Sequence, residues 1–169
     1  MKYLTVYVLL IALLLTACSA KKQESTLSHE ERTDLYETAI ESARDEATND
    51  AFPLIDESDD DAAELVFGLL NLSPEDMNAY AISVSLMNVK AYAIAAIYPA
   101  AGKEDTVLES LRGFVSSQQQ TFKEYLADQY EIAVNTRLET LEDGTVLLVM
   151  SKNQDAIFDS IRDVIERGK

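Results

Sequence analysis

Few residues in this 169-residue chain have the type and spacing that catalysis requires. The single histidine, His29, lies in the run His-Glu-Glu-Arg and not in the two-histidine pattern of zinc proteases. A serine or cysteine nucleophile needs a base beside it, and the sequence offers no clear partner. The acid pairs Glu75-Asp76 and Glu104-Asp105 stand where helices are expected to begin, and there the helix dipole stabilises them. We therefore expect no enzymatic activity and no cofactor or metal ion.

The residue with the clearest chemistry is Cys18, the only cysteine, which follows Leu15-Thr16-Ala17. Before this motif stand Met1-Lys2 and an apolar segment over residues 3–14 that a single threonine interrupts. The segment is shorter than the roughly 20 residues of a membrane-spanning helix and has the layout of a secretory signal.

The whole pattern resembles bacterial lipoprotein precursors. The alternatives are an ordinary signal peptide with a chance cysteine, or a short buried helix. The resemblance implies cleavage after Ala17 and a diacylglycerol on the sulfur of Cys18. Two acyl chains anchor a protein stably. We therefore expect a lipid-anchored, extracytoplasmic protein at the outer face of the cytoplasmic membrane.

Composition restricts the partners of the chain. Its 30 acidic and 14 basic side chains give a net charge of −16. Such a charge repels nucleic acids, so we expect no nucleic-acid partner. No cysteine follows Cys18, which excludes an internal disulfide.

The chain is expected to divide into a signal peptide (1–17), a lipidated tether (18–27), an acidic N-terminal helix and clip (28–57) and an α+β domain (58–169). Ser28 and Glu31 form a capping box that begins the N-terminal helix. Its apolar stripe is thin, so it either docks on the domain or remains a stalk. The acidic run over residues 56–61 could form a calcium-binding loop, but other residues stand where such a loop requires its glycine and its final glutamate. We expect this run to begin a second helix.

The body of the chain is expected to contain strand, strand and helix, twice over. After a helix start at residues 73–76, alternation predicts strands over 79–86 and 92–98, and an amphipathic helix follows from 104 to about 126. Alternating Tyr130, Ile132 and Val134 predict a third strand. The turn signature Asp143-Gly144 precedes a fourth strand over 145–151 and a final helix over 155–166.

The two halves match at an offset of 50 residues, for example Asp105 with Asp155 and Arg112 with Arg162. Coincidence between two amphipathic helices is the alternative to a true repeat. Two ββα units would form a four-stranded antiparallel sheet with both helices on one face. The other face would carry small apolar residues such as Ala79, and it must be covered by the N-terminal helices, by a second copy of the chain in a homodimer, or by an envelope protein partner.

The motifs of residues 73–76 and 83–91, Pro99, Gly102-Lys103 and residues 125–130 together resemble the domain of unknown function 4358. This is an uncharacterised lipoprotein family found mostly in Gram-positive bacteria of the clostridial kind. The resemblance covers roughly residues 62–149. It implies an extracytoplasmic lipoprotein, and it carries over no catalytic residues.

The sequence thus predicts a non-enzymatic binding or interaction module. A module that binds a small molecule or peptide would use a pocket between sheet and helices, and the candidate lining residues are Asn88, Tyr92 and Tyr98. An interaction lipoprotein would use a flat apolar surface. An envelope enzyme is the remaining alternative.

Overall fold

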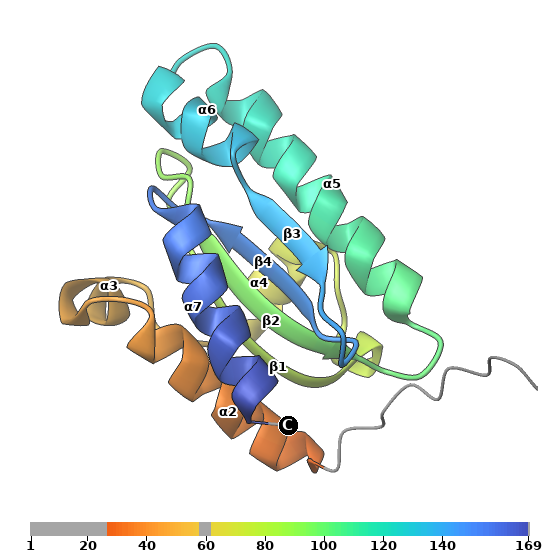
Figure 1. Ribbon diagram of the computed structural model, residues 1–169. Coiled ribbons are helices and arrows are strands. Elements are labelled where there is room, and N and C mark those ends of the chain that lie inside the picture. Colours follow the sequence, from red (N-terminus) through yellow and green to blue (C-terminus); the bar gives the residue numbers. More distant parts are fainter. Residues whose placement is uncertain (1–26, 58–61, 169) are drawn as a thin grey trace, which may run out of the picture.

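Four strands, β1 (Met77–Val84), β2 (Ala93–Pro99), β3 (Arg137–Thr140) and β4 (Val146–Met150), form one antiparallel sheet in the order β1–β2–β4–β3 (Figure 1). The computed structural model describes residues 27–57 and 62–168. The helices are α2 (His29–Ser42), α3 (Glu46–Ala51), α4 (Ala63–Leu70), α5 (Glu104–Phe122), α6 (Ala127–Val134) and α7 (Gln154–Arg167), with a 3-10 turn η1 (Pro74–Asp76) directly before β1. The α+β class and the four-stranded antiparallel sheet are confirmed.

The pairing register decides which side chains share a face of the sheet. Val84 lies opposite Ala93, and Ile82 lies opposite Ala95. Residues directly opposite one another point to the same face. The large residues of β1 therefore share a face with Ala93 and Ala95, whereas Tyr92 and Ile94 point to the other face. A shift of one residue exchanges the two faces of a strand, and cross-strand pairing alone settles which phase is adopted.

The two long helices lie on opposite faces of the sheet, so the expectation of both on one face is wrong (Figure 1). Helices α4, α5 and α6 cover one face, and α2 and α7 cover the other. The reason is that β4 is fully buried on both sides, with Leu148 in the α5 layer and Val149 in the α7 layer. A sheet with two apolar faces needs a layer on each. The face for which a second subunit was one alternative is thus covered within the chain.

The segment predicted as the third strand forms helix α6, so that prediction is wrong. Ala133 is fully buried whereas its neighbour Val134 is exposed. The side chain of Gln119 in α5 donates a hydrogen bond of 3.1 Å to the carbonyl oxygen of Ala133. Packing against α5 overrides an alternation that extends over only three apolar residues. The predicted 50-residue repeat therefore does not extend to this segment, because its counterpart 50 residues earlier is strand β1. The two halves correspond only in that each contains a long helix, α5 and α7.

Helix α2 docks on the sheet and does not form a stalk. Its predicted capping box is present, because Ser28 accepts from the backbone of Glu31 at 3.2 Å and donates to the Glu31 side chain at 2.8 Å. Tyr36, Ala39 and Ile40 are fully buried against the sheet and α7. Packing of this stripe supplies the stability that a thinly apolar helix lacks alone.

A buried polar cluster fastens the beginning of α2 to the β3–β4 turn. Arg32 and Asp143 form an ion pair of 2.6 Å, and each side chain is only 2% exposed. The Tyr36 and Thr145 hydroxyls share a hydrogen bond of 2.6 Å, and burial raises the pKa of Tyr36 to about 12. The Arg32 guanidinium lies 3.9 Å from the centre of the Tyr98 ring. These contacts fix the orientation of α2 along the sheet.

Candidate functional site

A cleft of about 1080 Å³ opens at the end of the sheet where β2 begins and β4 ends. Its lining comes from the α2–α3 corner, from residues 90–92, from α6 and from the beginning of α7. Figure 1 shows these elements gathered at one end of the molecule, with the first turn of α2 at the other end. Ligand pockets commonly occur where several element ends meet in this way.

The aromatic wall of the cleft is a stacked pair of rings. Phe52 and Tyr92 have ring centres 4.1 Å apart and ring planes inclined by 19°. Tyr92 is buried and Phe52 is half-buried, and both residues line the cleft. Such a rigid apolar surface beside polar groups suits a ligand with mixed character.

Arg44, from the loop between α2 and α3, holds this wall in place. Its Nη1 atom donates to the hydroxyls of Tyr92 and Ser83 at 2.9 Å each and to the carbonyl oxygen of Phe52 at 3.1 Å. Its Nε atom donates to Asn49 at 2.7 Å. All four partners are neutral, and Arg44 has no ion pair in the described part of the chain. Its charge is therefore left uncompensated by a direct contact.

Gln129 of α6 joins the helix to the strand end that borders the cleft. Its Oε1 atom accepts a hydrogen bond of 2.8 Å from the backbone N–H of Ala91. Its Nε2 atom donates to the Asp128 carboxylate at 2.8 Å. This bond lowers the pKa of Asp128, with a smaller contribution from the positive charge of Lys90. The carboxylate of Asp128 is thus ionised at neutral pH.

Charges of both signs line the cleft. Besides Arg44, the cations are Lys90 and Lys152, and neither forms an ion pair within residues 27–57 and 62–168. The anions are Asp45, Asp128 and Glu131. Three positive and three negative groups make the lining neutral, although the chain as a whole carries −16. The cleft is therefore much less negative than the rest of the molecule.

The corner between β4 and α7 holds a polar group without a partner. Ser151 is 5% exposed, lines the cleft, and its hydroxyl has no hydrogen-bond partner among the described residues. Asn153, the residue before α7, makes no side-chain capping bond. Buried polar groups are nearly always paired, so an unpaired hydroxyl at a cleft calls for a physical explanation.

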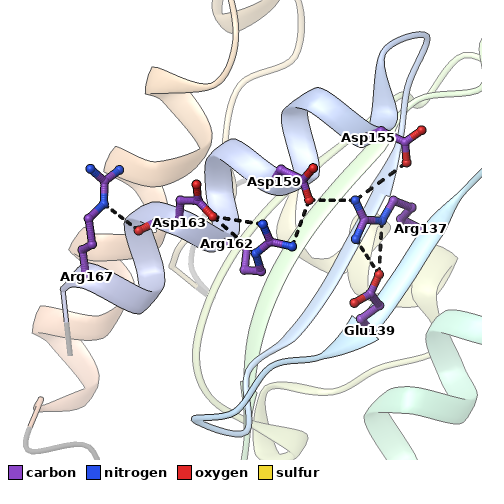
Figure 2. A network of polar contacts seen from close by, with 7 residues as sticks. All are labelled: Arg137, Glu139, Asp155, Asp159, Arg162, Asp163 and Arg167. Carbon is purple, nitrogen blue, oxygen red and sulfur yellow. Dashed lines mark hydrogen bonds and ion pairs between the residues drawn. The ribbon is translucent and has the colours of Figure 1, made fainter.

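Charged residues beside α7 but outside the cleft behave differently, as Figure 2 shows. Arg137 pairs with Glu139 at 2.6 Å, with Asp159 at 2.9 Å and with Asp155 at 3.7 Å. Arg162 pairs with Asp159 at 2.9 Å. Arg137 and Arg162 thus have carboxylate partners from the protein itself, and Arg167 donates to the carbonyl oxygen of Asp163. The ion pairs of Arg137 fasten α7 to β3.

The structure separates the residues predicted to line a site. Tyr92 lies in the cleft, whereas Tyr98 lies at the opposite end of the same strand, beside α2. Asn88 is exposed in the β1–β2 loop and does not line the cleft. Cys18 and Ala17 lie outside the described residues. Only one of the three candidate contacts is therefore in the cleft.

Sequence reasoning missed the residues that give the cleft its charge and its unpaired hydroxyl, namely Arg44, Lys152 and Ser151. The one available signal was the scarcity of cations in a chain with twice as many acids as bases. Arg32 and Arg44 both have an acid beside them in the sequence, yet Arg32 pairs with the distant Asp143, and Arg44 has no ion pair among the described residues. Only the tertiary structure separates the two cases.

In the part of the chain that the structure describes, no three His, Cys, Asp or Glu side chains converge in an arrangement that could hold a metal ion. Among the same residues, no helix combines the length and the apolar character needed to cross a bilayer.

Comparison with known proteins gives one match. The model of the family described as "Domain of unknown function (DUF4358)" matches residues 50–151. The match spans the sheet together with α4, α5 and α6, whereas α2 and α7, which supply two walls of the cleft, lie outside it. No curated protein and no solved structure matches the chain.

Proposed function

Since the chain belongs to the family described as "Domain of unknown function (DUF4358)", whose description names no activity, we propose its function from the cleft. The protein acts as an extracytoplasmic lipoprotein, anchored at the outer face of the cytoplasmic membrane through Cys18, that binds a polar small molecule or peptide without catalysis. The observation that carries this proposal is the cleft of about 1080 Å³ with unpaired cations, amide side chains and an aromatic wall.

The direction of α2 supports this arrangement. Near its beginning, Arg32 contacts Tyr98 at the end of β2, and just beyond its last turn Arg44 contacts Tyr92 just before β2. The two tyrosines are six positions apart in an extended segment, about 20 Å. With a lipid anchor ahead of α2, we expect the beginning of α2 to lie nearer the membrane and the cleft to remain accessible at the other end of the domain.

The first experiment measures the thermal unfolding midpoint of the full-length protein in detergent micelles against peptides, cell-wall fragments, sugars and lipids. A ligand at about 100 times its dissociation constant stabilises the folded state by roughly 2.7 kcal/mol. For a domain of this size, the midpoint rises by about 6 to 11 °C. A rise of this size identifies the ligand class.

A matched pair of variants then locates the binding site. Lys90→Glu reverses a charge in the cleft, whereas Lys123→Glu reverses the charge of an exposed lysine that does not line it. The proposal requires that the first variant lowers the affinity for the identified ligand and the second does not. Equal effects of the two variants would place binding elsewhere and reject the cleft as the site.

The anchoring part of the proposal has its own test. In cells grown with labelled palmitate, the wild-type chain is expected to carry the label and to remain in the membrane fraction, and Cys18→Ser is expected to do neither. Equal behaviour of both forms would reject lipidation at Cys18 and would leave the proposal for the cleft intact.

A protein partner is the second candidate, because the β1–β2 loop beside the cleft exposes Leu86, Met87 and Val89. Exposed apolar groups of this kind are common in protein interfaces. If the ligand panel is without effect, crosslinking from position 88 in the intact envelope tests this candidate. A crosslinked protein that disappears with Met87→Ser supports an interaction through the loop.

A further inference from the structure

The β4–α7 corner of the cleft has an unpaired hydroxyl that the fold itself does not use. Ser151 is 5% exposed, and its Oγ atom has no hydrogen-bond partner among the described residues. An unpaired buried hydroxyl lowers stability and is expected to persist where it has a partner that the protein does not supply. Ser151 lines the cleft, whereas its Oγ atom is itself covered, so a ligand in the cleft reaches the hydroxyl through another rotamer of this side chain.

The same corner contains the beginning of a 14-residue helix. The residue before α7, Asn153, makes no side-chain capping bond. Its side chain therefore does not satisfy the first backbone N–H groups of α7. Such a helix end has a partial positive charge and attracts an anionic group. Ser151, Asn153 and Gln154 all line the cleft, so the helix end and the unpaired hydroxyl border the same space.

Three cationic side chains add positive charge to the cleft. Arg44, Lys90 and Lys152 line the cleft, and none of them has an ion pair in residues 27–57 and 62–168. By contrast, Arg137 and Arg162, which lie outside the cleft, are paired with carboxylates of the protein (Figure 2). Unpaired cations in a strongly acidic chain favour an anionic ligand.

The acids of the cleft restrict that ligand further. Asp45, Asp128 and Glu131 make the lining neutral overall, and they would repel a phosphate group with its two charges. A single carboxylate can lie among the cations while the rest of the ligand donates hydrogen bonds or a positive charge to the acids. Peptides with a free C-terminus have this combination of groups.

We infer that the cleft binds a peptide-like ligand by its carboxylate at the β4–α7 corner, between the Ser151 hydroxyl, the first N–H groups of α7 and Lys152. This inference rests on the proposed binding function and names its ligand class. Ser151 and the helix N–H groups donate hydrogen bonds to the carboxylate, and Lys152 contributes charge.

The test compares N-acetyl-alanyl-alanine with its C-terminal amide, which has the same size and lacks the charge. Backbone amide resonances of the ¹⁵N-labelled full-length protein in detergent micelles report binding and its location. A charge-assisted hydrogen bond strengthens binding by about tenfold or more. We expect the acid to bind at least about tenfold more tightly than the amide and to shift the resonances of Ser151, Gln154 and Asp155.

Variants separate the binding role from a structural role. Ser151→Ala is expected to lower the affinity for the acid by about tenfold, to leave that for the amide unchanged, and to leave or raise the unfolding midpoint, because it removes an unpaired buried hydroxyl. Lys152→Ala is expected to lower the affinity for the acid by about two- to fivefold. Lys123→Ala, outside the cleft, is the control and should change neither affinity.

Three results overturn the inference. Equal binding of acid and amide in the cleft would show that the cleft does not recognise the carboxylate, although ligand binding as proposed above would stand. If the acid binds more tightly than the amide and Ser151→Ala does not change this difference, the carboxylate does not bind at the β4–α7 corner. Binding of neither probe up to its solubility limit would reject a peptide carboxylate, and the separate ligand panel would still decide the broader binding proposal.

Discussion

Replacement of Arg32 by methionine tests how α2 is held against the sheet. Methionine retains much of the apolar length of the side chain but leaves Asp143, which is 2% exposed, without its cation. Removing one partner of a buried ion pair costs about 3 to 5 kcal/mol. The contact of the guanidinium with the ring of Tyr98, at 3.9 Å, is also lost. We expect the variant to be destabilised by an amount within this range.

The assay is thermal unfolding followed by circular dichroism. An unfolding entropy of about 2.1 cal/mol/K per residue means that each kcal/mol lowers the midpoint by roughly 3 °C in a domain of this size, so the expected decrease is about 10 to 15 °C. Arg112→Met is the control, because Arg112 and its partner Glu109 have side chains that are 58% and 70% exposed. Exposed pairs contribute less than about 1 kcal/mol.

The double variant Arg32→Met with Asp143→Asn sharpens the test. It removes both charges of this buried pair, so it is expected to recover part of the stability lost in the single variant. A decrease for Arg32→Met no larger than that of the control would refute the reasoning. It would mean that the polar cluster does not fasten α2, and that only the apolar stripe holds the helix.

Two further predictions concern pH. A hydrogen bond with Asp56 and burial raise the pKa of Glu37 from 4.5 to about 7. An acid whose pKa is raised in the folded state opposes folding as the pH rises through this range, so Glu37→Gln should exceed the wild type in stability at about pH 8 and equal it near pH 4. Urea denaturation at both pH values checks this, and a pH-independent difference would contradict it. Asp76 has its pKa lowered from 3.8 to about 2, first by the 2.8 Å ion pair with Lys103. The ionised Asp76 stabilises the fold above about pH 4, and this stabilisation is lost toward pH 2. Asp76→Asn should therefore cost about 1 to 2 kcal/mol at neutral pH and almost nothing near pH 2. Acid unfolding curves of the two proteins should converge at low pH, and parallel curves would contradict the prediction.

Features that depend on near neighbours in the chain were predicted correctly. The capping box of Ser28 and Glu31, the turn at Asp143-Gly144 and the amphipathic helices α5 and α7 all occur where expected. Each arises from hydrogen bonds or side-chain spacing within a few residues, so the local sequence contains all the required information. The resemblance to the domain of unknown function 4358 also rests on short motifs, and the matching family model confirms that this domain is present.

Pattern reasoning failed where competing partners decided the outcome. The alternation of Tyr130, Ile132 and Val134 fits a strand, but the segment forms α6 because it packs on α5. Likewise, the face to which Tyr92 points follows from the pairing of Val84 with Ala93, which no single-strand pattern contains. Secondary structure in short segments depends on what they pack against.

The sequence by itself determined the class of the fold, the acidic character of the chain and the expectation of a lipid on Cys18, because composition and short motifs are sufficient for these. The tertiary structure alone decided the cleft. Its walls come from segments as far apart as Ser42 and Ser160, which are brought together by docking of α2 and α7 on the same face of the sheet. Whether Arg44 is paired, and whether the hydroxyl of Ser151 has a partner, depends on groups distant in the chain. Electrostatic compensation is a property of positions in space, and only the folded chain supplies them.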